Sequence, residues 1–244
     1  KQLHQLKWRW SAPPNRSRQS KGASYLMRLL ESFLAVTVRS GFELFGIGNL
    51  GDLLVAEGWN RFLSQEVTKS ANWLARHDHT SVVFDNKMWV IGGSVGAVRN
   101  DVWYSSDGTS WTQATSSAAW PARYDHTSVV FDNKMWVMGG ISSNRLNDVW
   151  YSSDGTSWTQ TTSSAGWTAR DSHTSVVFDN KMWVIGGSTG TVINDVWYSS
   201  DGTSWTQATS STGWPARYNH TSVVFDNKMW VMGGISSNRL NDVW

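Results

Sequence analysis

Short apolar segments rich in β-branched and aromatic residues recur through the last two thirds of the chain. The segment "SVVF" is followed each time by "MWVI" or "MWVM", and the first such pair occupies residues 81–91. Their apolar residues stand at successive rather than alternate positions, which is typical of strands buried on both faces. Asp and Asn lie between the two segments and favour a tight hairpin. The pattern therefore predicts β-hairpins inside sheets that are covered on both sides.

The whole pattern repeats every 47 residues. The letters "HTSVVFDNKMWV" begin at His79, His126, His173 and His220. The units comprise residues 72–118, 119–165, 166–212 and 213–244, and the fourth stops within a predicted strand. A fixed period of this length predicts repeated structural units, such as the blades of a propeller.

Each unit is expected to contain four strands. In the second unit, the hairpin ends at Gly139-Gly140, where the backbone needs conformational freedom or close approach. "NDVWYS" and "SWTQTT" then predict the third and fourth strands, separated by the turn "SDGT". A four-stranded sheet flanked by copies of itself is a propeller blade, and its stability is shared with its neighbours.

Tryptophan is the compositional anomaly. Of the 18 tryptophans, 15 stand at fixed positions of the repeats. We expect these rings to pack between blades, because large aromatic rings bury much apolar area.

A hydrophobic strand, a Gly-Gly pair, and a Tyr and a Trp separated by six residues follow each other in this order. The Tyr/Trp pairs are Tyr104/Trp111, Tyr151/Trp158 and Tyr198/Trp205. This arrangement resembles the kelch repeat of bacterial proteins and of the galactose oxidase central domain. The resemblance covers residues 73–244. It implies an all-β, kelch-type β-propeller that is incomplete, with three full four-stranded blades, a truncated fourth and a non-repeat N-terminal segment.

The N-terminal segment differs from the repeats in charge. Residues 1–70 contain ten Lys and Arg against five Asp and Glu, whereas residues 71–244 contain eleven against fourteen. We interpret residues 1–60 as a basic leader, part helical or disordered, and residues 61–244 as propeller blades. Charge alone leaves a nucleic-acid arm open for the leader, but the mildly acidic repeats indicate no nucleic-acid partner. No apolar run reaches membrane-spanning length.

Closure of the blades has two interpretations. Kelch-type propellers commonly have six or seven blades, and four is about the smallest ring. Residues 62–73 are similar to the end of a fourth strand, so they would complete the last blade and close a four-bladed ring. The favoured alternative is an open arc from a longer protein, whose exposed apolar blade faces would promote self-association.

The units differ mainly at two places, after Gly-Gly and before the repeated histidine, and antiparallel strand order puts both on one rim. Variation on one rim over a constant scaffold is typical of a binding surface. Drift in solvated loops and duplication of a two-blade block explain the same pattern. The candidate binding residues are Arg76, His77, Asp78, Arg99, Arg123, Tyr124, Asp125, Asn144, Arg145, Arg170, Asp171, Arg217, Tyr218, Asn219, Asn238 and Arg239.

Arginine and tyrosine at this rim favour a protein or glycan ligand. The arginine that recurs before each first strand has a structural alternative, in which it pairs with an Asp or a carbonyl of a neighbouring blade. For the four histidines, hydrogen bonding to backbone at the blade junctions is favoured over a metal ring, because their spacing is only the repeat spacing. We expect no metal, no cofactor and no catalytic residue.

An enzyme is the alternative class. Galactose oxidase depends on a Tyr–Cys crosslink, and this chain has no cysteine. The turn "SSDGTSW" resembles the Asp-box of sialidases, which is itself structural, and near-identical units offer no unique acid, base and nucleophile. The expected function is a non-catalytic interaction scaffold, with a sialidase-like, glycan-processing or oxidase-type enzyme fragment as the alternative. The compartment stays open, with a secreted or cell-surface location favoured.

Overall fold

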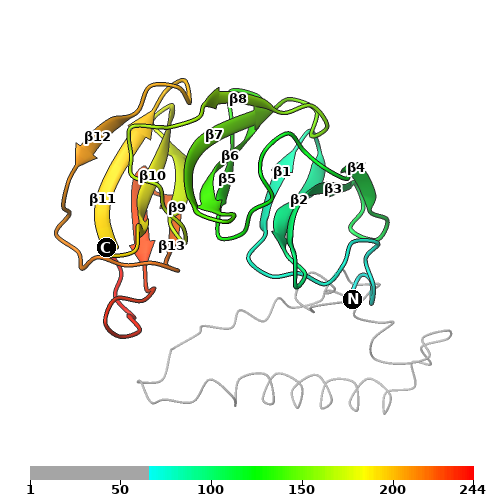
Figure 1. Ribbon diagram of the computed structural model, residues 1–244. Helices are drawn as coiled ribbons and strands as arrows, with labels where there is room; N and C mark the ends of the chain where they lie inside the picture. The colour runs from blue at the N-terminus through cyan, green and yellow to red at the C-terminus, as the bar shows by residue number, and fades with distance from the viewer. Residues whose placement is uncertain (1–65) are drawn as a thin grey trace, which may run out of the picture. The chain divides into compact units, whose positions relative to one another are not determined.

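A computed structural model of the protein describes residues 66–244, which form one all-β unit (Figure 1). The interpretation of residues 1–60 lies outside the described residues. The strands are β1 (Thr80–Phe84), β2 (Lys87–Ser94), β3 (Val98–Ser105), β4 (Thr112–Thr115), β5 (Thr127–Phe131), β6 (Lys134–Ile141), β7 (Arg145–Ser152), β8 (Thr159–Thr162), β9 (Thr174–Phe178), β10 (Lys181–Ser188), β11 (Val192–Ser199), β12 (Thr206–Thr209), β13 (Thr221–Phe225) and β14 (Lys228–Met232). In this part of the chain, no helix is long and apolar enough to span a membrane.

The strands form four antiparallel sheets, which are the expected blades. Blade one (β1–β4), blade two (β5–β8) and blade three (β9–β12) each have four strands in sequential order, and blade four contains β13 and β14. After β14 the chain folds back and runs alongside this strand, where Val231 and Trp244 exchange two backbone hydrogen bonds. The expected incomplete set of blades, three full and a truncated fourth, is therefore confirmed.

The hairpin between the first two strands of a blade has the expected turn. In blade two, Asp132 and Asn133 have φ angles of 48° and 54°, as a two-residue type I′ turn requires. Gly140 lies at a register shift between β6 and β7, with a φ of 92°. A Cβ on Gly140 would lie 2.6 Å from Cβ of His126. The close approach of the incoming chain segment thus explains the second glycine of the pair.

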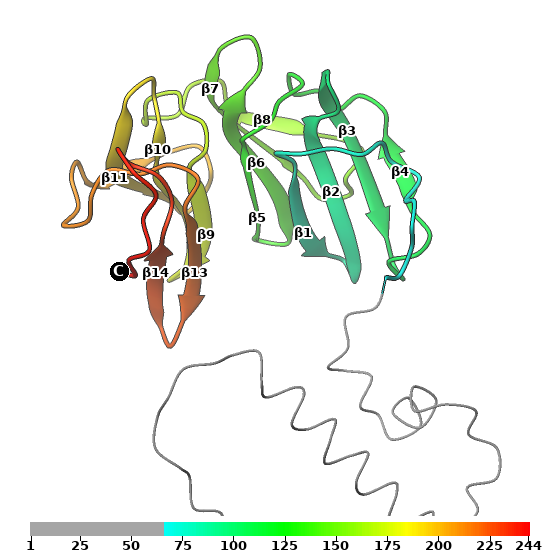
Figure 2. The same cartoon turned by 90° about the horizontal axis from the view of Figure 1, so that it is seen from below.

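The first strands of successive blades lie side by side. β1 contacts β5, β5 contacts β9, and β9 contacts β13. Within residues 66–244, β13 makes no contact with β1, so the blades form an open arc (Figures 1 and 2). The described part of the suggested closing segment, residues 66–73, contains no strand. Its Trp73 packs edge-on against Trp111 of blade one, at a ring distance of 5.7 Å, so these residues do not complete blade four.

The core lies between the blades, as the doubly apolar strands predict. Three buried clusters fill the three junctions, one for each pair of successive blades. The buried tryptophans are Trp89, Trp120, Trp136, Trp158, Trp167 and Trp214. At the first junction, the ring of Trp89 packs so closely on blade two that a Cβ on Gly155 would lie 2.1 Å from it. Indole packing between blades is therefore confirmed at these positions.

Candidate binding rim

The two variable segments of each unit meet at one edge of the arc. In blade two, Tyr124 precedes the repeated histidine, and Ile141 follows Gly-Gly. Their backbones exchange hydrogen bonds of 3.0 and 2.9 Å, and the equivalent residues pair in every unit. The expected adjacency on one rim is confirmed. We call this edge the variable rim.

The residue before each repeated histidine links neighbouring blades at the variable rim. The N–H of Asp125 donates to the carbonyl of Asp78 at 3.1 Å, and those of Ser172 and Asn219 donate to the preceding member of the series at 3.0 Å. All four residues have φ angles of 52–53°. The backbone is therefore the same in each blade, while the side chain varies between Asp, Ser and Asn.

These four residues surround a cavity of about 230 Å³. Its walls are formed by Asp78, His79, Asp125, His126, Ser172, His173, Asn219 and His220. A second cavity, of about 270 Å³, shares His173 and His220 with the first and is otherwise lined by threonine and serine of the first strands. The cavity thus has a mouth whose outer side chains change from blade to blade and an inner wall that does not change.

The histidines of the inner wall hold blades together. Nε2 of His126 shares a hydrogen bond of 2.9 Å with Oγ1 of Thr80 in the preceding blade, and His173 and His220 repeat this contact at 3.0 and 2.9 Å. The threonine hydroxyl is a partner that the sequence did not predict, and the backbone of Ile91 in the preceding blade also hydrogen-bonds the His126 ring. Burial, with the positive charge of Arg123, lowers the pKa of His126 to about 3, so the ring is neutral.

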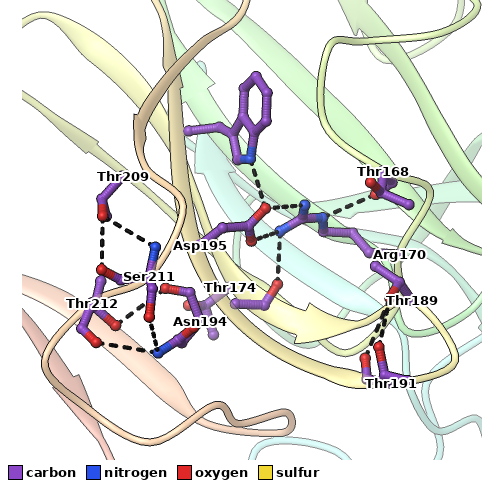
Figure 3. A network of polar contacts seen from close by, with 12 residues as sticks. Thr168, Arg170, Thr174, Thr189, Thr191, Asn194, Asp195, Thr209, Ser211 and Thr212 are labelled. Carbon is purple, nitrogen blue, oxygen red and sulfur yellow. Dashed lines mark hydrogen bonds and ion pairs between the residues drawn. The ribbon is translucent and has the colours of Figure 1, made fainter.

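The arginines that recur before each first strand are buried beneath the rim. Arg123 donates to both carboxylate oxygens of Asp148 at 2.7 and 2.8 Å, and to the carbonyl of Gly139 at 2.9 Å. Figure 3 shows the same pairing of Arg170 with Asp195 in blade three. The equivalent pairs in the other units are Arg76 with Asp101 and Arg217 with Asp242.

Each of these arginines pairs with an aspartate 25 residues later in its own unit. The suggested partner in a neighbouring blade is therefore wrong, although the structural role agrees with that alternative. The guanidinium groups are enclosed and bonded, so they are not available to a ligand in this conformation. We leave Arg76, Arg123, Arg170 and Arg217 out of the proposed site.

The other candidate residues lie on or near the rim surface. Arg145 forms an ion pair with Asp171, which links the loop of blade two to the entry segment of blade three. His77 bonds Asp78 at 2.6 Å. The exposed candidates are His77, Asp78, Asn144, Arg145, Asn219, Asn238 and Arg239, the half-buried ones are Arg99, Tyr124, Asp125 and Tyr218, and Asp171 is buried.

The mouth is acidic on the side of the first two blades, which contribute Asp78 and Asp125. Burial, and then the negative charges of Asp78 and Asp171, raise the pKa of Asp125 to about 6. Above this pH Asp125 is ionised, and its carboxylate lines the cavity together with the side chain of Asp78. Sequence analysis missed Ser172 and the four histidines as lining residues. Their signal was available, because Ser172 occupies the repeat position of Asp78, Asp125 and Asn219.

Comparison with known families agrees with this architecture. A family model described as the KLHDC2/KLHL20/DRC7 Kelch-repeats domain matches residues 59–244. No curated protein sequence matches the chain significantly. Kelch-repeat domains act in general as scaffolds for protein interactions. The match covers well over half of the chain, and the chain belongs to the kelch-repeat family.

Proposed function

We propose that this protein is a non-catalytic scaffold that binds a protein ligand at the variable rim. The observation that carries the proposal is the mouth of the cavity. There, four equivalent positions have one backbone conformation and three different side chains. Such an arrangement lets a surface change its chemistry without changing its fold.

Several residues that would be obvious catalytic candidates have structural partners. The buried arginines are bound to aspartates, and His126, His173 and His220 are bound to threonines. Both sets recur from unit to unit, whereas an active site needs an asymmetric set of acid, base and nucleophile. This supports a binding role over the enzyme alternative. The bacterial origin and the likeness to galactose oxidase stay predictions from the resemblance.

The rim offers a mixture suited to protein recognition. Carboxylates at the mouth attract cationic groups of a ligand, while exposed Asn144 and Arg145 on the loop of blade two supply donors around it. A protein ligand follows the general role of kelch domains. A glycan ligand is the other outcome of the binding test.

The test compares two double variants of matched chemistry. Asp78→Asn with Asp125→Asn removes both mouth charges and introduces the residue that blade four carries at this position. The control, Asp132→Asn with Asp179→Asn, removes the same charge from hairpin turns at the opposite ends of the strands, where Asn also accepts positive φ.

Binding is measured by affinity capture from an extract of the source cells and on a glycan array. We expect the unmodified protein and the control to retain the same protein ligand, and the mouth variant to lose at least tenfold in affinity. Retention by all three forms would refute the mouth as the site. Binding to defined glycans alone would replace the protein ligand by a carbohydrate. Turnover in a glycosidase or oxidase screen that the mouth variant abolishes would favour the enzyme class.

A further inference from the structure

A histidine ring is enclosed at each of the three described blade junctions. His126 and His173 are 4% exposed, and His220 is 5% exposed. Each ring packs against the glycine pair of the preceding blade, and a Cβ on Gly139 would lie 2.9 Å from Cε1 of His173. Nε2 of each ring bonds a threonine hydroxyl of the preceding blade. A positive charge on such a ring would therefore be largely shielded from water.

The charges around these rings also oppose protonation. Each ring lies near the buried arginine three residues before it, and His173 is influenced by His126 and His220 as well. The carboxylates beside the arginines are already bound to them in ion pairs. Within residues 66–244, no carboxylate bonds any of the three rings. A proton on a ring would thus meet a positive neighbour and no countercharge of its own.

The carboxylates that share the cavity with the histidines do not supply this countercharge. Asp78 bonds His77 at 2.6 Å, and the nearby Asp171 forms an ion pair with Arg145. Burial, and then the negative charges of Asp78 and Asp171, raise the pKa of Asp125 to about 6. Asp125 therefore loses its charge in the same acidic range in which a protonated histidine would need it.

These surroundings keep the rings neutral well below the pH at which an exposed histidine takes up a proton. Burial, followed by the charge of the neighbouring arginine, lowers the pKa of His126 to about 3 and that of His220 to about 4. The same causes lower the pKa of His173 well below its ordinary value of 6.5. Between about pH 6.5 and 4, these histidines thus bind protons only when they leave the junctions.

A protonated ring also changes the hydrogen bond that joins the blades. It donates from both nitrogens, so the threonine hydroxyl can only accept from it and must find another acceptor for its own proton. We propose that the three junctions form an acid-sensitive switch, in which protonation of His126, His173 and His220 separates successive blades and dismantles the cavity that these residues line. Stability in an array of repeats is shared between neighbours, so loss of the junctions weakens every blade. The switch requires no ligand and does not depend on the proposed function.

The size of the effect follows from the number of protons that the chain takes up on unfolding. Because folding lowers the pKa of each histidine, its contribution to stability is complete above pH 6.5 and is lost as the pH falls toward the folded value. Each of the three raises the unfolding constant by about tenfold per pH unit in this window. Asp125 acts in the opposite direction, because the folded protein binds its proton below about pH 6 and the unfolded chain only below 3.8. The half-buried His79, whose pKa is also lowered, adds to the effect of the three histidines.

The decisive experiment measures urea unfolding at pH 6 and at pH 5. Glutamine replaces the histidines, because its amide can still bond the threonine hydroxyl but does not titrate. The variants are His126→Gln, His173→Gln and the double variant. His77→Gln is the matched control, because the side chain of His77 is 69% exposed. Tryptophan fluorescence and circular dichroism, followed together, establish that each form unfolds in a single transition.

Three histidines against one aspartate predict that the unfolding constant of the unmodified protein and of the control rises at least about one hundredfold from pH 6 to pH 5. The rise should be about tenfold smaller in each single variant and about one hundredfold smaller in the double variant. An unfolding constant that does not depend on pH would overturn the proposal. A rise that the glutamine variants leave unchanged would overturn it too.

A measurement on the unmodified protein keeps the proposal testable where a variant fails to fold. The Cε1 protons of the histidines are followed by nuclear magnetic resonance in the folded state between pH 7.5 and 5. We expect the chemical shifts of His126, His173 and His220 to stay constant over this range, as those of neutral rings do. A titration of any of these three with a midpoint near 6.5 would show that protons enter the intact junction, and the switch would be refuted.

Discussion

The buried ion pair of blade two allows a quantitative test of how a blade is held together. The side chain of Arg123 is fully buried and that of Asp148 is 7% exposed, and the two form a bidentate pair. Arg123→Met keeps most of the apolar stem, but it removes the guanidinium, whose carbon lies 5.6 Å from the ring centroid of Trp120, and leaves Asp148 without its countercharge. Breaking a buried pair from one side costs about 3–5 kcal/mol, and we expect Arg123→Met to lower the free energy of unfolding by this amount.

The repeat supplies its own control for this prediction. Arg217 makes the same pair with Asp242 in blade four, but the side chain of Asp242 is 33% exposed. An exposed carboxylate keeps part of its hydration when its partner is removed, so Arg217→Met should cost clearly less than Arg123→Met. Adding Asp148→Asn to Arg123→Met removes the unpaired charge while keeping an oxygen for the indole N–H of Trp150. This double variant should be more stable than Arg123→Met alone.

Urea unfolding is the assay, followed by tryptophan fluorescence and circular dichroism together. The two probes must give coincident transitions before free energies are compared, because repeat proteins can unfold in steps. Equal costs for Arg123→Met and Arg217→Met would show that burial of the carboxylate does not set the effect. A cost below about 1 kcal/mol for Arg123→Met would mean that the pair behaves as a surface salt bridge, and the reasoning would fail.

Two further predictions concern the rim and the blade junction. The pKa of Asp125 rises from 3.8 to about 6 on folding, so its contribution to stability is full below pH 3.8 and is lost as the pH rises through 6. Asp125→Asn should therefore gain stability relative to the unmodified protein between pH 4 and 7.5. The gain is on the order of 1 kcal/mol, because solvent screens this half-buried carboxyl. Chemical denaturation of Asp125→Asn and of the unmodified protein at pH 4 and at pH 7.5 measures the difference between their free energies of unfolding. A difference that is the same at both pH values would contradict the prediction. Gly155→Ala should destabilise by about 1–3 kcal/mol more than Gly96→Ala, because a Cβ at Gly155 meets Trp89 whereas one at Gly96 meets nothing within 4 Å. Both glycines have positive φ, so equal melting temperatures would exclude the ring contact as the cause.

Much of the blade could be predicted from local pattern. Apolar residues at successive positions indicated doubly covered strands, and Asp132-Asn133 indicated a turn with positive φ. Antiparallel order then placed the two variable segments on one edge. These features depend on neighbours in sequence or on strand alternation, which the residue letters report directly.

The partners of polar side chains could not be predicted in the same way. Arg123 finds Asp148 within its own unit, and His126 finds Thr80 in the preceding blade. Which of these applies depends on how far each side chain reaches across the junction and on the twist of the sheets. Because the units are nearly identical, each possible partner residue occurs at an equivalent position in all four units. The sequence alone therefore does not distinguish a contact within a blade from a contact between blades. Residues 66–73 show a related limit, because similarity to a strand ending does not say which blade a segment joins; the sequence therefore left a closing strand open beside the favoured open arc.

The similarity of the four units also explains why effects on ligand binding can be separated from effects on stability at the variable rim. At the four positions before the repeated histidines, the backbone has the same φ and makes the same hydrogen bond to the preceding blade wherever that blade is described. The chain itself places Asp, Ser and Asn in that conformation, so exchanging these residues between blades introduces no backbone strain that the fold does not already contain. A loss of ligand after Asp78→Asn with Asp125→Asn would therefore report on the side chains at the mouth. Replacing Arg123, by contrast, removes a side chain that is part of the core and leaves Asp148 unpaired, so its effect is on stability rather than on binding.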